Sequence, residues 1–598
     1  MADNEQMSFE FMERKTIKGY PELHWTGKRP YKSTVYYPAQ LKEVYGESKN
    51  DWLNKIFWGD NLQVMSHLLK DYRGKIDLIY IDPPFDSKAD YKKKIKLKGK
   101  TIENDSSTFE EKQYGDIWTN DEYLQFMYER LVLMRELLSD KGSIYLHCDW
   151  HKSHHLRMVM DEIFGMNFFR NEIVWCYDKW VAPSRDFQKN HDIILKYSKT
   201  DDFISNTIRE IDEKRQITLD RGYTTNLLAN GEKQLIVYKG QEEKPNIQKL
   251  MQSGKFVRVI IREPEGNPIK DWWQINILHP KALERLDYPT QKPENLIERI
   301  IMASSNPGDL VFDCFMGSGT TQAVAMKLGR RFIGADINLC AIQTTTKRLI
   351  NVANELNSQI ESEDKYTGVE VYNVNNYDLF RNPLEARDLI LQALEVQPYE
   401  TSNVYDGEKD GRMIKVMPVN RIATKADLKG ILSNLPYKQF ERIKEENPGA
   451  VVLKLTLVCM GHESDLAAAL KQELSQYKTD IDVVDILHDR SDLQFKRDSE
   501  AEITIEGNEL VIKNFYPLNL MQKLSLDKET VDEWRQLVES VMIDFNYDGA
   551  VMQPTTIDLP DKDKMVVGRY KIPSDAGIIR VKITDVLSES LEVEVQNG

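Results

Sequence analysis

The chain has 598 residues, of which 41% are hydrophobic and 29% are charged, which indicates a globular protein of about two or three domains. Its formal net charge is -15, but the acidic excess lies beyond residue 350, so a polyanionic partner is not excluded. No stretch approaches the roughly 20 apolar residues of a membrane span, and the five cysteines lack the paired spacing of a disulfide framework or zinc cluster. We therefore expect a cytoplasmic protein.

The predicted elements alternate between strand and helix from about residue 56 onwards. Residues 1–50 carry Pro30 and Pro38 and predict an extended N-terminal arm. Apolar runs and helical periods then predict a strand ending at Gly59, a helix from Leu62, a strand over 75–81, a helix over 121–138, strands over 143–148, 172–177 and 192–197, and a helix over 294–303. This order is typical of an α/β fold with a largely parallel, doubly wound sheet.

Two stretches of the front half show no clear period. Residues 86–117 contain a run of lysines, which we interpret as a mobile basic loop, with a solvated charge run as the alternative. Residues 200–280 are predicted to be irregular and polar, with interspersed aromatic side chains.

The pattern changes beyond about residue 355, so we place a domain boundary near 355–380 and predict an acidic C-terminal α+β domain over 360–598. Its predicted strands are 451–458, 502–512, 577–583 and 591–595. Residues 404–412 predict a hairpin. Residues 544–549 resemble a calcium loop without its downstream glutamate, so a turn is the better interpretation.

Four histidines, His147, His151, His154 and His155, follow the predicted strand 143–148 and suggest a metal site. Only some of them share a helix face, and the zinc-protease arrangement with its glutamate is absent from the sequence. We therefore favour ordinary helix-start and surface histidines, and predict no metal.

The tetrapeptide Asp82-Pro83-Pro84-Phe85 directly follows the predicted strand 75–81, at the edge where open α/β sheets bind ligands. Its two prolines fix φ and lack N–H donors, which leaves carbonyl acceptors beside the carboxylate of Asp82. An exocyclic amine of adenine or cytosine has two N–H donors that such acceptors can hold, and Phe85 offers a stacking face. The pattern favours a site for an extruded amino base over an ordinary turn.

A glycine-rich turn follows a second buried strand at 310–312. Its residues are Asp313, Phe315, Gly317, Ser318, Gly319, Thr320 and Thr321. Glycines there allow close backbone approach of a nucleotide-like ligand, and Asp336, at the end of the next predicted strand, is placed to accept ribose hydroxyls. The missing third glycine disfavours a nicotinamide cofactor, and the absence of a lysine after Gly319 excludes the phosphate loop of a nucleotide triphosphatase.

These motifs resemble the DNA amino-methyltransferases of the permuted β class, in particular the modification subunits of type III restriction systems. The resemblance covers about residues 50–350 and rests on Gly59-Asp60-Asn61, 79–88, Asp287-Tyr288-Pro289-Thr290-Gln291-Lys292-Pro293 and 313–321. In this class the Asp82 motif precedes the glycine motif, as it does here. The resemblance implies a Rossmann-like α/β methyltransferase domain over 51–355, dependent on S-adenosylmethionine.

The resemblance also implies roles for individual residues. The cofactor would be bordered at its methionine end by Thr290, Gln291, Lys292, Pro293, Asp313 and Phe315–Thr321, at its ribose by Asp336, and at its adenine by Asp60 and Asn61. Asp82, Pro83, Pro84 and Phe85 would hold the target base for direct in-line displacement by its nitrogen. Because the motif begins with Asp, N6 of adenine is favoured over N4 of cytosine.

The larger type III subunits carry a long target-recognition insertion after the Asp82 motif, where this chain has only the lysine-rich stretch 86–117. We therefore expect sequence reading in residues 178–280, where cations and aromatics mix, including Trp180, Arg258, Arg262 and Trp273. The predicted DNA contacts are Lys88, Lys92, Lys93, Lys94, Arg185, Lys189 and Trp272. Internal packing of this segment is the alternative.

Double-stranded DNA is the expected partner, and the resemblance adds a homodimer and a helicase or nuclease subunit of a phage-defence system, docked on the C-terminal domain. N4 of cytosine is the alternative target. Two other functions stay open: methylation of RNA or protein, and a DNA-binding subunit that senses methylation with little activity alone. The intact Asp82 and the intact glycine turn favour an active enzyme.

Overall fold

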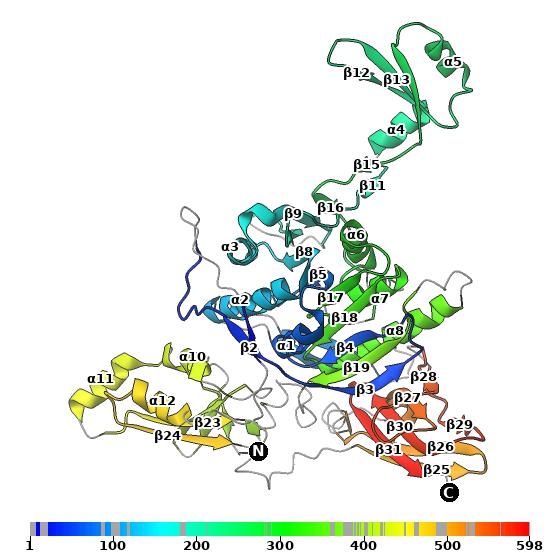
Figure 1. The fold of residues 1–598 in the computed structure, drawn as a ribbon. Coiled ribbons are helices and arrows are strands. Elements are labelled where there is room, and N and C mark those ends of the chain that lie inside the picture. Colours follow the sequence, from blue (N-terminus) through cyan, green and yellow to red (C-terminus); the bar gives the residue numbers. More distant parts are fainter. Residues whose placement is uncertain are drawn as a thin grey trace.

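A computed structural model describes residues 8–11, 22–84, 90–96, 108–115, 120–179, 187–211, 213–279, 290–358 and 365–374 and, with gaps, 282–288 and 387–596. Its largest element is a ten-stranded sheet at the centre of the molecule (Figure 1). The strands, in spatial order, are β16 (Trp272–Gln274), β9 (Phe169–Cys176), β10 (His191–Ser198), β8 (Leu138–Cys148), β5 (Ile76–Ile81), β17 (Leu310–Asp313), β18 (Arg331–Asp336), β4 (Asn54–Trp58), β19 (Val369–Val374) and β3 (Ala39–Tyr45).

The six strands from β8 to β19 are parallel to one another, and only β10 and β3 run against the direction of the rest. Alternate residues of the central strands face opposite sides, so Ile79 and Ile81 of β5 enter one core while Leu78 and Tyr80 enter the other. A sheet buried on both faces needs apolar side chains on both sides. The near-continuous apolar run of β5 meets this need and made the strand predictable.

The direction in which successive strands are added to the sheet reverses between β5 and β17. From β5 it continues through β8 to one side, whereas from β17 it continues through β18 to the other. β5 and β17 are themselves parallel neighbours, with Val311 opposite Leu78. Ligands bind at the carboxyl edge of such a switch point in open α/β sheets, and Asp82 and Asp313 both lie there.

Helices cover both faces of the sheet (Figure 1). α1 (Asn61–Tyr72), α2 (Asn120–Leu137) and α3 (Ser153–Ile163) pack on one core, and α6 (Glu294–Ser304), α7 (Thr320–Lys327) and α8 (Leu339–Asn357) on the other. The helices predicted over 121–138 and 294–303 are confirmed within one residue at each end. Among the described residues, no helix is long and apolar enough to cross a membrane.

The sheet extends beyond both limits of the predicted methyltransferase domain, 51–355. β3 comes from the segment predicted as an extended arm over 1–50, and β19 comes from the segment assigned to the C-terminal domain at 360–598. The two strands pair with each other, and β19 pairs with β4, so both belong to the central sheet. Two short strands, β1 (Ser8–Glu10) and β2 (Ser33–Val35), pair separately. Edge strands of mixed polarity carry a weak sequence signal, which explains the error.

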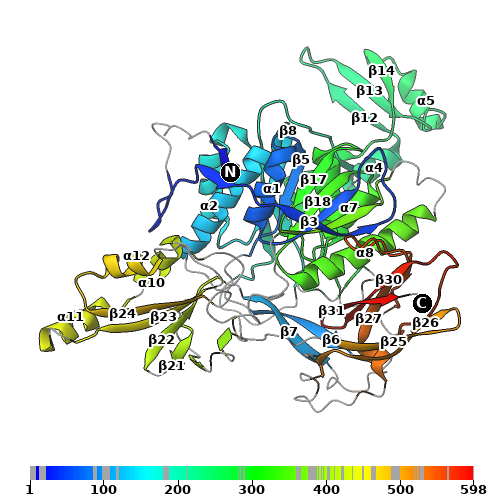
Figure 2. The same cartoon turned by 60° about the horizontal axis from the view of Figure 1, so that its bottom comes forward.

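The interpretation of 200–280 as irregular is wrong. This segment forms a lobe that projects from the central body in both views (Figures 1 and 2). Its elements are β11 (Arg209–Glu210), α4 (Glu213–Arg221), β12 (Tyr223–Leu227), β13 (Lys233–Tyr238), α5 (Pro245–Met251), β14 (Arg258–Arg262) and β15 (Asn267–Pro268). A small core of Leu235, Val237 and Ile247 holds it together. So few apolar positions produce little periodicity.

The lysine-rich stretch 86–117 is not a simple loop in its described parts. β6 (Asp90–Lys96) and β7 (Thr108–Gly115) pair as antiparallel strands. In this register Lys93 lies opposite Glu111, and Lys94 lies opposite Glu110. The run of lysines hid this strand pattern in the sequence.

The predicted C-terminal α+β domain consists of two units with separate cores, which lie apart in both views (Figures 1 and 2). The first contains β20 (Gln397–Pro398), β21 (Gly407–Lys409), β22 (Arg412–Val416), α10 (Leu428–Ser433), α11 (Tyr437–Glu446), β23 (Leu453–Cys459), α12 (Leu466–Glu473) and β24 (Thr479–Asp485). The second contains β25 (Glu500–Glu506), β26 (Glu509–Tyr516), β27 (Val538–Asp544), β28 (Thr556–Asp558), β29 (Arg569–Lys571), β30 (Ile578–Asp585) and β31 (Ser590–Gln596).

The local predictions in these units had mixed outcomes. The hairpin near 404–412 is confirmed by the pairing of β21 with β22. The single strand predicted over 502–512 is wrong, because Gly507, with φ of 64°, turns the chain between β25 and β26. The turn interpretation at 544–549 is confirmed, since Asp544 and Asp548 accept hydrogen bonds from nearby backbone amides.

The second unit, over 500–596, docks on the edge of the central sheet. Met552 exchanges backbone hydrogen bonds with β3, to the carbonyl of Lys42 and from the amide of Val44, both at 2.9 Å. Beside this bridge, Lys582 of β30 forms a buried ion pair with Glu43, which also accepts a hydrogen bond from the Tyr45 hydroxyl at 2.6 Å. One buried charge pair therefore lies at the junction.

We predict that Lys582→Ala lowers the free energy of unfolding by about 3 kcal/mol, because Glu43 would stay buried without its counter-charge. Lys564→Ala is the matched control, since Lys564 and Asp561 form an exposed pair of the kind that contributes about 0–1 kcal/mol. Denaturant unfolding of both variants measures the difference. Equal stabilities of the two variants would contradict the role of the junction pair.

Candidate active site at the carboxyl edge of the sheet

Asp82 follows β5 with its two carboxylate oxygens directed at different partners. Oδ2 pairs with the ammonium of Lys292, which lies just before α6, and Oδ1 lies 3.2 Å from Nδ1 of His147. The side chain of Asp82 is 18% exposed, so it is reachable yet largely shielded. Pro83, the next residue, is buried. The two segments that carry Asp82 and Lys292 are thus brought together, as the sequence motifs predicted.

His147 and Asp192 were not among the predicted site residues. His147, in β8, is fully buried, and its Nε2 lies 3.4 Å from Asp192 Oδ2 in β10. Burial raises the pKa of Asp192, but the hydrogen bond and charge of His147, the charge of Lys292 and the hydrogen bond of Tyr177 outweigh it and lower the pKa overall. The interpretation of His147 as an ordinary helix-start or surface histidine is wrong, because it lies inside the sheet edge next to Asp82.

Asp313 ends β17 and anchors the start of the glycine turn. It accepts hydrogen bonds from the Phe315 amide at 3.0 Å and from the Thr321 hydroxyl at 2.6 Å. Burial raises the pKa of Asp313 to about 7, despite these two hydrogen bonds, and the charges of Asp82 and Asp336 raise it further. A second carboxylate thus lies buried in the electrostatic field of Asp82.

Asp336 ends β18 and closes the turn from the other side. Its carboxylate accepts hydrogen bonds from the amides of Gly317 and Asn338, both at 2.9 Å. Burial raises the pKa of Asp336 to about 6. The carboxylate predicted from the end of this strand therefore contacts the glycine turn directly.

Side chains of α8 hold the glycine turn in place through hydrogen bonds. The Thr345 hydroxyl donates to the carbonyl of Gly317 at 3.0 Å, and Arg348 donates to the Ser318 carbonyl at 3.1 Å and to the Thr320 hydroxyl at 2.9 Å. Gly319 has φ of 70°, and a Cβ there would lie 2.5 Å from Thr345. Glycine is required at this position by both backbone conformation and space.

Residues 290–293 lie at the same edge of the sheet, where Lys292 pairs with Asp82. Gln291 fixes this segment by donating to the Glu284 carbonyl at 2.6 Å and accepting from the Leu286 amide at 2.8 Å. Thr290 has a positive φ of 63°, and its carbonyl accepts from Lys292 at 3.3 Å. Pro293 is the residue that precedes the first turn of α6. Thr290 is thus a non-glycine residue in the left-handed backbone region, two residues before Lys292.

Asp60 and Asn61 lie at the start of α1, at the same sheet edge. Asp60 caps the helix by accepting from the Leu62 amide at 2.9 Å, and Asn61 donates to the Cys314 carbonyl at 3.2 Å. Arg130 of α2, which sequence reasoning missed, donates to both, with Nη2 3.1 Å from Asp60 Oδ2. This arginine ties α2 to the start of α1, where Asn61 contacts the glycine turn, and its role was visible only in the tertiary structure.

The predicted DNA contacts are partly outside the described residues: Phe85, Lys88, Trp180 and Arg185 lie there, and for Lys92, Lys93 and Lys94 the structure describes only the backbone of β6. Lys189 stacks over the Trp150 ring, with Nζ 3.5 Å from its centroid, and Trp150 is 46% exposed. Trp272 is exposed on β16. Trp273, in contrast, is buried in the core, which excludes it as a surface contact.

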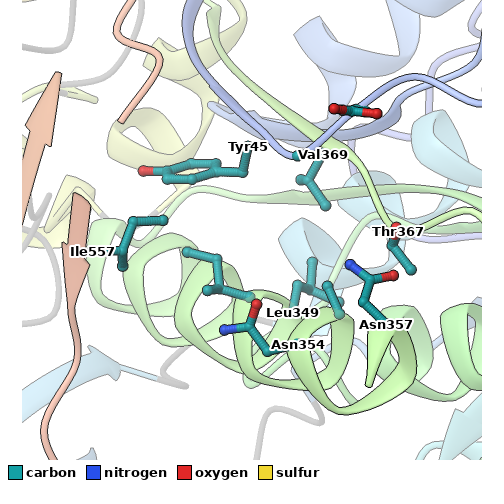
Figure 3. A pocket seen from close by; sticks show the side chains of 11 residues that line it. Tyr45, Leu349, Asn354, Asn357, Thr367, Val369 and Ile557 are labelled. Carbon is teal, nitrogen blue, oxygen red and sulfur yellow. The ribbon is translucent and has the colours of Figure 1, made fainter. Parts of the chain in front are cut away.

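A pocket of about 440 Å³ lies between α8, β3, β19 and β28, away from the motif edge (Figure 3). Its described lining includes Leu349, Asn354, Asn357, Thr367, Val369 and Ile557, which are aliphatic or neutral polar, and Glu47 is its single carboxylate. Paired ionisable groups, which acid-base chemistry needs, are absent from this lining. Among the described residues, no cluster of His, Cys, Asp and Glu suits a metal ion.

Comparisons with known proteins match the part of the chain that carries this edge. Residues 76–347 match a family model described as DNA methylase. The chain is 28% identical to the type II methyltransferase M.EcaI of Enterobacter cloacae over 58% of this chain and 82% of that protein. It is 29% identical to the StyLTI Mod subunit, a type III restriction-modification protein of Salmonella typhimurium, over 49% and 53%, and 27% identical to the DNA adenine methyltransferase YhdJ of Escherichia coli over 49% and 82%.

The family match covers the switch point of the sheet and the carboxylates that lie there. Together these features define an α/β methyltransferase domain. Through residues 76–347 the chain is similar to the DNA methylases, as the resemblance predicted. S-adenosylmethionine is accordingly its methyl donor. The matched range, 76–347, runs from the first residue of β5 into α8 and so includes the Asp82 motif, Lys292 and the glycine turn.

We predict that Gly319→Ala weakens binding of S-adenosylhomocysteine at least tenfold, because the new Cβ displaces Thr345 and the turn it supports. Gly74→Ala is the matched control: Gly74 has the same φ of 70° but no heavy atom within 4 Å of the added Cβ. The control is expected to lose only about 1–2 kcal/mol of stability from backbone strain. Calorimetric binding and thermal unfolding measure both. Unchanged binding in Gly319→Ala would contradict the packing argument.

Proposed function

We propose that this protein methylates the N6 amino group of adenine at a specific DNA sequence, as the modification enzyme of a restriction-modification system. The observation that carries the proposal is Asp82, a largely shielded carboxylate at the switch point, directly followed by two prolines. The adenine choice is supported by Asp at the first motif position and by the similarity to the DNA adenine methyltransferase YhdJ. The setting is supported by the kinship with M.EcaI and the StyLTI Mod subunit.

Two hydrogen-bond acceptors hold the amino group of the target base. One N–H of the extruded base donates to the carboxylate of Asp82 and the other to the carbonyl of Pro83, because Pro83 and Pro84 have no backbone N–H that competes there. Two such hydrogen bonds orient the lone pair of the amino nitrogen toward the glycine turn. Positioning of this kind is a large part of catalysis when two bound groups react directly.

The residues of the edge fit S-adenosylmethionine. Asp313 is buried and Asp336 is half-buried, and the pKa values of both carboxylates are raised, so this edge is short of positive charge. The turn between them has no Cβ at Gly317 or Gly319, which leaves room for a nucleotide-like ligand. When bound, S-adenosylmethionine supplies an electrophilic methyl group on a positively charged sulfur. Asp336 would hold its ribose hydroxyls, and Asp313 would favour its positive charge.

We predict that Asp82→Ala abolishes methylation, because the target amine loses its charged acceptor. Long-read sequencing of DNA from cells that express each form measures the mark, its base and its sequence together. Asp140→Ala is the control, since Asp140 is 85% exposed at the surface. N6-methyladenine at one repeated motif, present in the control and absent in Asp82→Ala, is the expected result.

N4-methylcytosine in the same data would replace adenine as the target while leaving the methyltransferase assignment intact. No modified base from the parent protein would contradict the enzymatic proposal and favour a subunit that senses DNA.

DNA is proposed to approach over the segment that follows β8 and precedes β10. An exposed tryptophan, Trp150, with the Lys189 ammonium over its ring, offers both stacking surface and positive charge three residues beyond His147. Phe187 adds a ring that is 99% exposed. The lobe over 209–268, with Arg258 and Arg262 on its exposed edge strand, is proposed to read sequence further along the duplex.

We predict that Lys189→Ala weakens DNA binding and lowers the slope of log affinity against log salt by about one, as expected when one phosphate contact is lost. Lys49→Ala is the matched control, because Lys49 also lies over an aromatic ring, Tyr366, but near the far edge of the sheet. Fluorescence anisotropy at several salt concentrations measures both. An unchanged slope in Lys189→Ala would contradict the proposed approach.

A helicase or nuclease partner is proposed because the StyLTI Mod protein is a subunit of a type III restriction-modification enzyme. The C-terminal units over 387–485 and 500–596 are the proposed docking region. The homodimer and the cytoplasmic location expected from the sequence stay predictions.

A further inference from the structure

His147 is enclosed by ionisable groups from several elements. Its side chain is fully buried in β8, and the Trp175 ring of β9 packs against it with centroids 5.4 Å apart. The titratable or charged groups that face it or its direct partners are Tyr80 and Asp82 from β5, Asp192 from β10, Tyr177 after β9, Lys292 before α6, Asp149 after β8 and Asp313 from β17.

The partners of His147 fix which ring nitrogen carries hydrogen in its neutral form. Burial and the charges of Asp82, Asp313 and Asp192 raise the pKa of Tyr80 well above its usual value, so Tyr80 keeps its proton and donates it to His147 Nδ1 at 3.2 Å. Asp192 is an acceptor at 3.4 Å from Nε2. The neutral imidazole therefore carries its hydrogen on Nε2 and presents a lone pair on Nδ1.

Asp82 Oδ1 faces the same lone pair at 3.2 Å. This oxygen is buried and, among the described residues, has no hydrogen-bond donor. Two facing acceptors are unfavourable unless a proton lies between them. Lys292 holds the other oxygen of Asp82, so a proton that replaces the Tyr80 hydrogen at His147 Nδ1 would lie between Nδ1 and Oδ1, with Asp192 facing Nε2 of the resulting imidazolium.

We propose that His147, backed by Asp192, is a positioning residue that receives, through Asp82, the proton released by the target amine. The inference rests on the proposed function. The amino nitrogen forms a bond to the methyl carbon while the electron pair of the breaking S–C bond stays on sulfur. One N–H bond of the resulting cation then breaks, its electron pair returns to nitrogen, and its proton passes to Asp82 and on to His147 Nδ1.

The first test is the pH dependence of the single-turnover methylation rate. In the parent protein the rate is expected to rise with pH as the shared proton leaves the pair. His147→Asn is expected to lower the plateau rate about 10–100-fold and to move the acid limb to lower pH, because Asp82 then titrates without the imidazole. Affinities for DNA and S-adenosylhomocysteine are expected to stay within about twofold of the parent values, since the imidazole faces Asp82 and Asp192.

His24→Asn is the matched control, since His24 is 78% exposed and pairs with Glu22. Its rate is expected within about twofold of the parent rate at every pH. An acid limb that stays in place in His147→Asn, with the rate lowered equally at all pH values, would mean a merely structural histidine and would overturn the proposal.

The second test does not depend on turnover. Nitrogen-15 spectra of the full chain, labelled at histidine, distinguish the two neutral tautomers, and the signals of His147 are those missing from His147→Asn. The Nε2–H form at high pH, with a titration that changes in Asp192→Asn, is expected. The Nδ1–H form would overturn the proposal. If the parent methylates no DNA while the spectra match, the proposed function fails and the proton-sharing pair stands.

Discussion

The pairing of β5 with β17 is the constraint on which the site depends. These parallel neighbours come from distant parts of the chain, yet Asp82 and Asp313 at their ends lie at the same edge of the sheet. The sheet reverses its order between them, so the helices that follow diverge to opposite sides and leave the edge open. A change that shifted this register would separate the group that holds the base from the turn that holds the cofactor, even if each motif stayed intact.

α8 contacts both the glycine turn and the C-terminal β unit. One part of the helix supports the glycine turn through Thr345 and Arg348, and Lys347 pairs with Glu539 of the C-terminal β unit at 2.8 Å. Adjacent residues of one helix thus contact the cofactor turn and a separate unit. Because a helix is a rigid element, α8 supports both the docking of the C-terminal β unit and the shape of the glycine turn. The C-terminal unit is thereby part of the architecture of the site rather than an appendage.

The sequence was informative where function depends on local order. The Asp82 motif, the glycine turn and Lys292 each sit next to a strand or helix end, so their spacing predicted their place. His147 and Arg130 could not be predicted, because their partners Asp192, Asp60 and Asn61 come from other elements. The same reason explains β3 and β19, whose membership in the sheet depends on pairing. The small lobe over 209–268 has too few apolar residues for a clear period.

Two carboxylates at this sheet edge ionise less readily than free carboxylates do. Asp313 and Asp336 have pKa values raised to about 7 and about 6, so ionising them in the folded chain costs free energy that is absent in the unfolded chain. This cost is absent well below pH 4 and grows as pH rises toward 7. A cationic ligand beside them removes the cost by lowering both pKa values. Carboxylates that lack sufficient counter-charge thus favour a positively charged ligand at this edge.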